Sequence, residues 1–296
     1  MAKAKIFTGA ATALITPTTS QGVDFDAYGK LIDWQIEHGI DALVVAATSG
    51  EGATLNDEEH KKVIEYAVKR VNHRVPVIAG TGSNDTAYGI QLTKAACDMG
   101  VDGCLVVTPY YNKVTQSGLV RMYEEYDKAT SKPIIVYNVP SRTGVNIQPA
   151  TYKKISQFEN IVGIKEANGD LSSVATTASL VGDDLTIYSG NDDQIVPILS
   201  LGGQGVISVL SNICPKETHD IVYKYLEGDV KESRRLQLKY LDLIHSLFCE
   251  VNPIPVKAAC AAMGFCENYL RAPLYPMEGA DLERLLTSMR NVGLEV

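Results

Sequence analysis

The chain has 296 residues, 45% of them hydrophobic, and a mean hydropathy of −0.01, which is typical of a globular protein with a sizeable core. Its formal charge of −8 and isoelectric point near 5.2 give no electrostatic basis for binding nucleic acid or an anionic membrane. No apolar run approaches the length of a signal peptide or a transmembrane span. We therefore expect a cytoplasmic protein with a small-molecule ligand, no nucleic-acid partner and no membrane partner.

The cysteines are widely spaced and lack the patterns of a zinc site or a disulfide framework. No CxxC pair occurs, and no histidines stand near them at ligand spacing. We expect reduced core thiols and no metal. The six positions are Cys97, Cys104, Cys214, Cys249, Cys260 and Cys266.

Short apolar, β-branched runs alternate along the chain with amphipathic segments of helical length. The eight runs occupy residues 11–16, 42–48, 75–82, 103–109, 133–138, 161–167, 185–190 and 205–209. Strands of this kind that alternate with helices predict a parallel sheet covered by helices, and eight units match the (β/α)8 TIM barrel, an α/β fold. A doubly wound open sheet is the alternative, but GTGSND at 80–85 lacks the third glycine of a dinucleotide-binding turn.

Helix signals support the barrel prediction, and after Val209 the alternation of strands and helices ends. Asn56 with Glu59 three residues later predicts a capping box, and Pro149 suits a first helical position. Beyond Pro215 the pattern is helical throughout. We expect a barrel over 1–225 and a C-terminal helical appendage over 226–296 that packs on the barrel. The expected helical segments there are 216–228, a long one over 229–250, one after 252–257 and one over 281–293.

The run IVGIKEA, residues 161–167, carries Lys165 to the end of the sixth expected strand. Burial removes the hydration of an ammonium group, so the pKa of a desolvated lysine falls and its free amine can attack a carbonyl to form a Schiff base. The alternative is a structural lysine that reaches solvent or pairs with Glu166.

Polar residues at the other strand ends decide between these readings, because chemistry in a TIM barrel sits at the carboxyl ends of the strands. Tyr137 lies on the neighbouring strand, and the two-residue period of strands allows its phenol and the Lys165 amine to share the barrel mouth. Each residue also has a structural reading: Tyr137 as a packing residue, the 48–55 loop as an ordinary polar loop and Arg142 as a solvated turn residue.

Taken together, these side chains suit carbonyl chemistry on an anionic substrate. Lys165 would supply the amine, Tyr137 a general acid and base, and Thr48 or Ser49 a hydroxyl between proton carriers. Backbone N–H groups near Ser49 and Gly190 suit one carboxylate, and the guanidinium of Arg142 suits a second. The iminium would act as the electron sink, so we expect no cofactor.

Several long motifs resemble those of the dihydrodipicolinate synthase family, within the class I pyruvate-dependent aldolases. They occur in the same order and cover essentially the whole chain. The motifs are TSGEGATL (48–55), VTPYYNK (107–113), YNVPSRTG (137–144), GIKEANG (163–169), YSGND (188–192), GVISV (205–209) and NPIPVKAA (252–259).

The resemblance implies a lyase that condenses pyruvate with L-aspartate 4-semialdehyde to 4-hydroxy-tetrahydrodipicolinate in lysine and diaminopimelate biosynthesis. It implies a homotetramer, a dimer of tight dimers. The implied catalytic residues are Lys165 as the Schiff-base lysine, Tyr137 and Thr48 as the proton relay, and Tyr111 lent by the neighbouring subunit. The implied substrate-binding residues are Arg142 for the semialdehyde carboxylate, and Ser49, Gly190 and Ile207 lining the pyruvate pocket.

Two departures from the family pattern bear on function. Ser49 stands where a second threonine is usual, which keeps the hydroxyl. Tyr88 stands where lysine-inhibited members carry an acidic residue, although His60, Asn84 and Tyr110 remain, so we expect weak or absent inhibition by lysine.

Two other functions compete with this one. The first is a related aldolase acting on sialic acid or 2-keto-3-deoxy sugars, in which the resemblance implies no counterpart of Arg142. The second is a catalytically silent barrel that binds a small acid.

Overall fold

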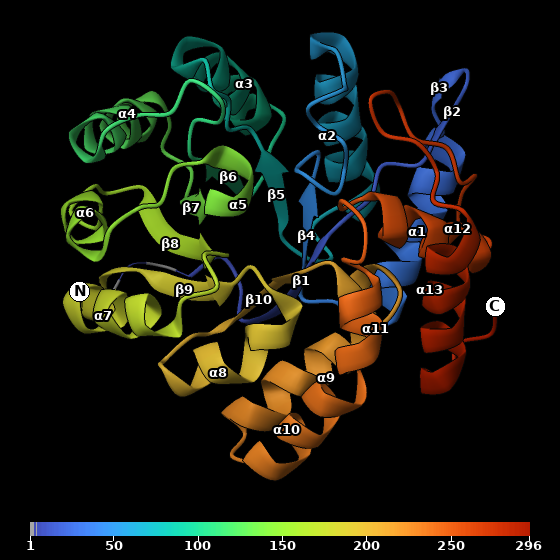
Figure 1. The fold of residues 1–296 in the computed structure, drawn as a ribbon. Helices are drawn as coiled ribbons and strands as arrows, with labels where there is room; N and C mark the ends of the chain where they lie inside the picture. The colour runs from blue at the N-terminus through green and yellow to red at the C-terminus, as the bar shows by residue number, and fades with distance from the viewer. Residues whose placement is uncertain (1–2, 4) are drawn as a thin grey trace.

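The computed structural model describes residue 3 and residues 5–296. Parallel strands close into a barrel, in the order β1-β10-β9-β8-β7-β6-β5-β4, which confirms the (β/α)8 prediction (Figure 1). The barrel strands are β1 Gly9–Ala13, β4 Ala42–Val45, β5 Val77–Gly80, β6 Gly103–Val107, β7 Ile134–Asn138, β8 Ile161–Glu166, β9 Thr186–Ser189 and β10 Gly205–Ser208. A short hairpin, β2 Thr18–Thr19 with β3 Gly22–Val23, follows the first strand and has no counterpart in the prediction.

Helices surround the barrel on its outer side (Figure 1). Those between barrel strands are α1 Phe25–Glu37, α2 Asp57–Val71, α3 Thr86–Asp98, α4 Gln116–Ala129, α5 Pro140–Thr143, α6 Pro149–Ile155, α7 Leu171–Val181 and α8 Ile195–Ser200. The helices after β10 are α9 Pro215–Leu226, α10 Val230–Lys239, α11 Leu241–Ser246, α12 Ile254–Ala262 and α13 Gly279–Val292. The described residues also form three short 3-10 helices between these elements, η1 Gly182–Asp184, η2 Asp192–Gln194 and η3 Leu210–Asn212.

Alternation of side chains separates two cores. One face of the strands packs against the helices, and the other fills the barrel interior with residues such as Val44, Ile78, Leu105 and Ile135. At the amino-terminal end of the barrel, Phe7 stacks on Tyr188 with ring centroids 4.3 Å apart. The interior is therefore a packed core with its polar groups left at the carboxyl ends of the strands.

Two helix starts that local signals predict are confirmed. The side chain of Asn56 accepts from the N–H of Glu59 while the Glu59 carboxylate accepts from the N–H of Asn56, so the predicted capping box is confirmed. Pro149 is the first residue of α6, as expected. The long helix predicted over 229–250 is wrong, because the helix breaks at Tyr240 into α10 and α11. The first strand expected over 11–16 is also wrong in its bounds, because β1 spans Gly9–Ala13.

The C-terminal helices contact the barrel and its outer helices. Trp34 on α1 packs on Phe265, with ring centroids 4.6 Å apart. Lys257 on α12 donates to Thr18 in the β2–β3 hairpin at 2.8 Å. Within residues 3 and 5–296, no helix has the length and apolar character needed to cross a bilayer. All six cysteines are free thiols, and Cys104, Cys214 and Cys260 are buried.

Candidate active site

Lys165 is the second-last residue of β8, and its side chain points into the mouth of the barrel. The residue is 5% exposed. Desolvation by burial lowers the pKa of Lys165 to about 7; the negative charge of Asp192 opposes this shift, and the positive charge of Arg142 adds to it. A large fraction of the amine is therefore neutral at neutral pH, which a nucleophile requires.

Tyr137 on β7 is the register partner of Lys165 on β8. The Lys165 Nζ lies 4.3 Å from the centre of the phenol ring, so the predicted convergence of these two side chains is confirmed. Burial raises the pKa of Tyr137, while the charge of Arg142 and the nearby Thr48 hydroxyl partly oppose the rise. The phenol thus holds its proton at neutral pH and can act first as an acid.

Glu166 points away from Lys165, so the alternative reading of a Lys165–Glu166 pair is wrong. Successive side chains of a strand face opposite sides, and the Glu166 carboxylate lies on the helix side of β8. It accepts hydrogen bonds from Asn138 Nδ2 and Tyr152 Oη, both at 2.9 Å. Burial raises the pKa of Glu166 to about 7.

A cavity of about 180 Å³ lies at the Lys165 amine. Six of the predicted site residues line it: Lys165, Tyr137, Thr48, Ser49, Arg142 and Gly190. Further lining residues that the sequence did not single out are Ser141, Asn191, Val209, Phe248 and Asn252. The structure thus brings together an amine, a phenol, hydroxyls and a guanidinium contributed by β4, β7, β8 and β9 and their loops.

Asn252 links two of the predicted substrate-binding residues. Its carbonyl oxygen accepts from Arg142 Nη2 at 2.8 Å, and its side-chain amide donates to Ser49 Oγ at 3.1 Å. Within the described residues, the backbone N–H groups of Ser49 and Gly50 have no hydrogen-bond acceptor. Ser49 lines the cavity, so its N–H and its hydroxyl form a pair of donors suitable for a carboxylate.

Gly190 leaves space at the cavity but offers no free hydrogen-bond donor to a substrate. Its N–H donates to the carbonyl of Glu166 at 2.7 Å, so it is not available to a substrate. A Cβ atom at this position would lie 2.8 Å from Ala167 Cβ, which excludes a larger residue without movement. Ile207, also predicted to line the pocket, is fully buried in the barrel interior and does not line the cavity.

Tyr111 lies away from the cavity of its own chain. Its side chain is 92% exposed, and its backbone has φ of +70°, a left-handed conformation that costs energy for a tyrosine. The neighbouring Tyr110 lines a second, larger cavity of about 410 Å³. An exposed aromatic side chain on a constrained backbone is available to another molecule but does not complete the site of its own chain.

The larger cavity adjoins the first across a shared wall of Thr48, Tyr137, Arg142 and Asn252. His60, Ser83, Tyr88 and Tyr110 are among the residues that line it further out. Tyr88 Oη donates to the Asp57 carboxylate at 3.2 Å.

Sequence reasoning missed Asn252, Phe248 and Asp192. Asn252 stands in the NPIPVKAA motif, which carried the resemblance without any assigned role. Phe248 and Asn252 come from the C-terminal helical region, so strand-end reasoning could not find them. Asp192 is the last residue of the YSGND motif, is 2% exposed and accepts from the N–H groups of Val209 and Leu210, each at 2.9 Å. Within residues 3 and 5–296, no cluster of three or more His, Cys, Asp or Glu has the arrangement of a metal site.

Comparison with known proteins agrees with this geometry. The family model described as the dihydrodipicolinate synthetase family matches residues 6–291. A 4-hydroxy-tetrahydrodipicolinate synthase from Clostridium perfringens is 53% identical over 289 residues, covering 98% of this chain and 99% of the relative. The solved dihydrodipicolinate synthase from Thermotoga maritima superposes with a TM-score of 0.96 at 42% identity, covering 98% of this chain and all of the relative.

A second solved relative carries a substrate-sized ligand. The dihydrodipicolinate synthase from Acinetobacter baumannii, solved in complex with pyruvate, has a TM-score of 0.96 at 40% identity and covers 98% of this chain and 100% of its own. Similarity extends over the full length in sequence and in structure. On these grounds the chain belongs to the dihydrodipicolinate synthetase family.

Proposed function

We propose that this chain condenses pyruvate with L-aspartate 4-semialdehyde through a Schiff base on Lys165, and so supplies 4-hydroxy-tetrahydrodipicolinate for lysine and diaminopimelate biosynthesis. The observation that carries the proposal is the buried Lys165 amine, with a pKa of about 7, held over the Tyr137 ring at the wall of a small cavity. Full-length relatives named 4-hydroxy-tetrahydrodipicolinate synthase support the same activity.

The first half of the reaction fixes pyruvate. The neutral amine of Lys165 attacks the keto carbon, and the resulting carbinolamine loses water to give an iminium. Tyr137, protonated at neutral pH, donates a proton to the departing hydroxyl, and Thr48 lies beside it to pass protons on. The iminium then accepts the electron pair released when a methyl proton leaves, which gives the enamine.

The second half forms the carbon–carbon bond. The enamine carbon attacks the aldehyde carbon of the second substrate, and the aldehyde oxygen takes up a proton. The amino group of that substrate then displaces the Lys165 amine at the iminium carbon as the ring closes. Tyr137 would supply the proton to the aldehyde oxygen, since its ring centre lies 4.3 Å from the Lys165 Nζ and its phenol lines the same cavity.

The hydrogen-bond donors of the site would bind two carboxylates, one from each substrate. The N–H and the hydroxyl of Ser49, which lines the cavity together with Lys165, would hold the pyruvate carboxylate. Arg142, exposed at the rim and fixed by Asn252, would hold the carboxylate of the semialdehyde through a charge-assisted bond. A relative solved with pyruvate supports binding of that keto acid in this fold.

Trapping of the imine tests the mechanism. The protein is incubated with pyruvate, reduced with borohydride and weighed by mass spectrometry, and a single adduct is expected. Lys165→Ala should give none. Lack of an adduct on the unchanged protein, or its persistence in Lys165→Ala, would remove the Schiff base from this site.

Arg142 distinguishes the proposed substrate from those of related aldolases. A coupled assay with pyruvate, aspartate semialdehyde and the downstream reductase is run beside an assay of N-acetylneuraminate cleavage. Turnover only in the first is expected. In Arg142→Lys, which loses the two-pronged donor set, KM for the semialdehyde should rise about tenfold or more while pyruvate trapping stays within a few fold. Turnover of N-acetylneuraminate alone would overturn the substrate assignment.

Assembly and compartment belong to the same proposal. Exposure of Tyr111 suits a homotetramer built as a dimer of dimers, in which each copy lends this tyrosine to the site of its neighbour. Six free thiols suit a reducing compartment, so we place the reaction in the cytoplasm. Sedimentation of the protein together with kinetics of Tyr111→Phe tests the assembly: a monomer with full activity would contradict it.

A further inference from the structure

The turn that carries Thr48 and Ser49 has a strained backbone on both sides. Ala46 and Glu51 both have φ of +53°, in the left-handed region that non-glycine residues avoid. Such conformations persist only where surrounding contacts hold them. The turn at 46–51 therefore depends on groups outside itself for its shape.

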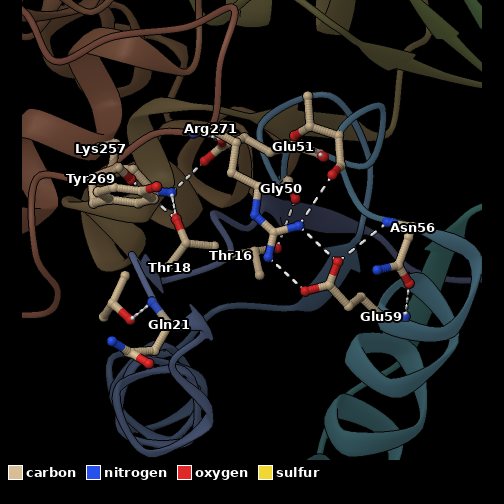
Figure 2. Close-up of polar contacts among 12 residues, drawn as sticks. Thr16, Thr18, Gln21, Gly50, Glu51, Asn56, Glu59, Lys257, Tyr269 and Arg271 are labelled. Atoms are coloured by element: carbon tan, nitrogen blue, oxygen red, sulfur yellow. Dashed lines mark hydrogen bonds and ion pairs between the residues drawn. The ribbon is translucent and has the colours of Figure 1, made fainter.

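An ion pair buried beneath this turn provides one such contact. Glu51 Oε1 accepts from Lys257 Nζ on α12, and both side chains are almost fully buried, with exposed fractions of 1% and 0% (Figure 2). Glu51 Oε2 accepts from the backbone N–H of Arg271 at 3.2 Å. Lys257 also donates to Thr18 at 2.8 Å. Segments more than 200 residues apart in the sequence thus meet at the Glu51 carboxylate.

Other contacts hold the middle of the turn. Thr16 donates to the carbonyl of Gly50 at 2.8 Å, and Asn252 donates to the Ser49 hydroxyl at 3.1 Å. The segment 252–257 therefore reaches the turn twice, at Ser49 through Asn252 and at Glu51 through Lys257. Any shift of α12 relative to β4 would move both attachment points.

The energetics do not favour this ion pair as a simple stabiliser. Removing two charges from water costs so much that replacing a buried pair by apolar side chains of similar size is often neutral or stabilising. An apolar pair, however, would not fix the direction of the Glu51 backbone. The charged pair therefore contributes by fixing the position of the 46–51 turn.

We propose that Glu51 and Lys257 are positioning residues for the keto-acid carboxylate site: they hold the 46–51 turn so that the N–H and the hydroxyl of Ser49 face the cavity that Lys165 also lines. The inference rests on the proposed function. It assigns the C-terminal helical region a part in substrate binding, since both Lys257 and Asn252 belong to it.

A second ion pair offers a matched control. Arg271 donates to both carboxylate oxygens of Glu59 at 2.6 and 2.7 Å, and so also connects the C-terminal region to helix α2 of the barrel (Figure 2). This pair is partly exposed, and Glu59 lies in the first turn of α2, outside the 46–51 turn. Replacing these two side chains keeps the bond from the backbone N–H of Arg271 to Glu51, so the residues at Ser49 should keep their arrangement.

The experiment compares neutral replacements of the two pairs. In Glu51→Gln/Lys257→Met no charge is left buried alone, and Glu59→Gln/Arg271→Met is the control. Two quantities are measured: the melting temperature, and the pyruvate concentration that gives half-maximal borohydride-trapped adduct. The first double variant should need roughly tenfold more pyruvate, as expected when a group supporting a site is removed, with a smaller change in kcat at saturating pyruvate. The control should stay within twofold whatever its melting temperature.

A half-saturating pyruvate concentration within twofold of that of the unchanged protein, in a folded Glu51→Gln/Lys257→Met variant, would overturn the proposal. Glu51→Asp provides a second readout if that variant does not fold. It keeps the charge but shortens the side chain by one methylene, and it too should need severalfold more pyruvate, whereas a purely stabilising role predicts no change. Failure of the proposed Schiff base is distinguishable, because the unchanged protein would then form no adduct. A different second substrate would leave the adduct, and therefore this test, intact.

Discussion

Lys165 and Tyr137 are register partners on adjacent strands, and the Lys165 Nζ lies 4.3 Å from the centre of the Tyr137 ring. The ring face attracts the ammonium form of the lysine, while burial favours the neutral form. The proposed nucleophile therefore stands beside its proposed proton donor before substrate arrives. Such preorganisation lowers the entropic cost of the reaction.

Imine formation should depend on pH with a midpoint near neutrality. Because burial lowers the pKa of Lys165 to about 7, the amine is mostly protonated at pH 6 and mostly neutral at pH 8. The initial rate of borohydride-trapped adduct formation should rise about tenfold across that interval and then level off. A flat profile, or a midpoint near that of lysine in water, would contradict the desolvated amine.

Tyr137→Phe should lower kcat by about 10²- to 10⁴-fold, since it removes a general acid and base but keeps the ring under the lysine. Steady-state kinetics and thermal unfolding measure this together, and the melting temperature should change little. Tyr152→Phe is the control: it deletes another buried hydroxyl, one that donates to Glu166 on the far side of β8. The control should lose stability with activity within a few fold, and equal kinetic losses in both variants would refute a specific role for Tyr137.

Lysine should inhibit this protein weakly or not at all. Tyr88 presents a phenol, already bonded to Asp57, at the position where the family resemblance implies a carboxylate in lysine-inhibited members. That carboxylate would pair with the ammonium group of the ligand. A charge-assisted bond of that kind is worth roughly 1.5 to 3 kcal/mol. Inhibition is measured in the coupled assay, and Tyr88→Glu should make the protein more sensitive to lysine. Half-inhibition of the unchanged protein at micromolar to low millimolar lysine would defeat this prediction.

His219 and Asp41 should give stability that is present in acid and lost in base. The His219 Nδ1 lies 2.9 Å from Asp41 Oδ2, and this hydrogen bond raises the pKa of His219. The pair contributes fully below the unfolded pKa of histidine, about 6.5, and its contribution fades as pH rises through the higher folded value. His219→Gln should therefore lower the melting temperature more at pH 5.5 than at pH 8.5. An equal loss at both pH values would show that the charge interaction is negligible.

Sequence by itself determined the barrel and six of the fifteen residues that line the cavity. Alternation of apolar strands with capped helices identified the (β/α)8 order, and a period of two along β7 and β8 placed Tyr137 beside Lys165. These features depend on near neighbours or on repetition, so short-range patterns record them. The same holds for the capping box at Asn56.

Tertiary structure alone decided how the site is held. Asn252 reaches Ser49, and Lys257 reaches Glu51, across more than 200 residues of chain, and no local period encodes such contacts. The break at Tyr240, which divides one expected helix, is likewise absent from the helical periodicity of that segment. The lowered pKa of Lys165 is also a tertiary property, since desolvation depends on every segment packed around the amine.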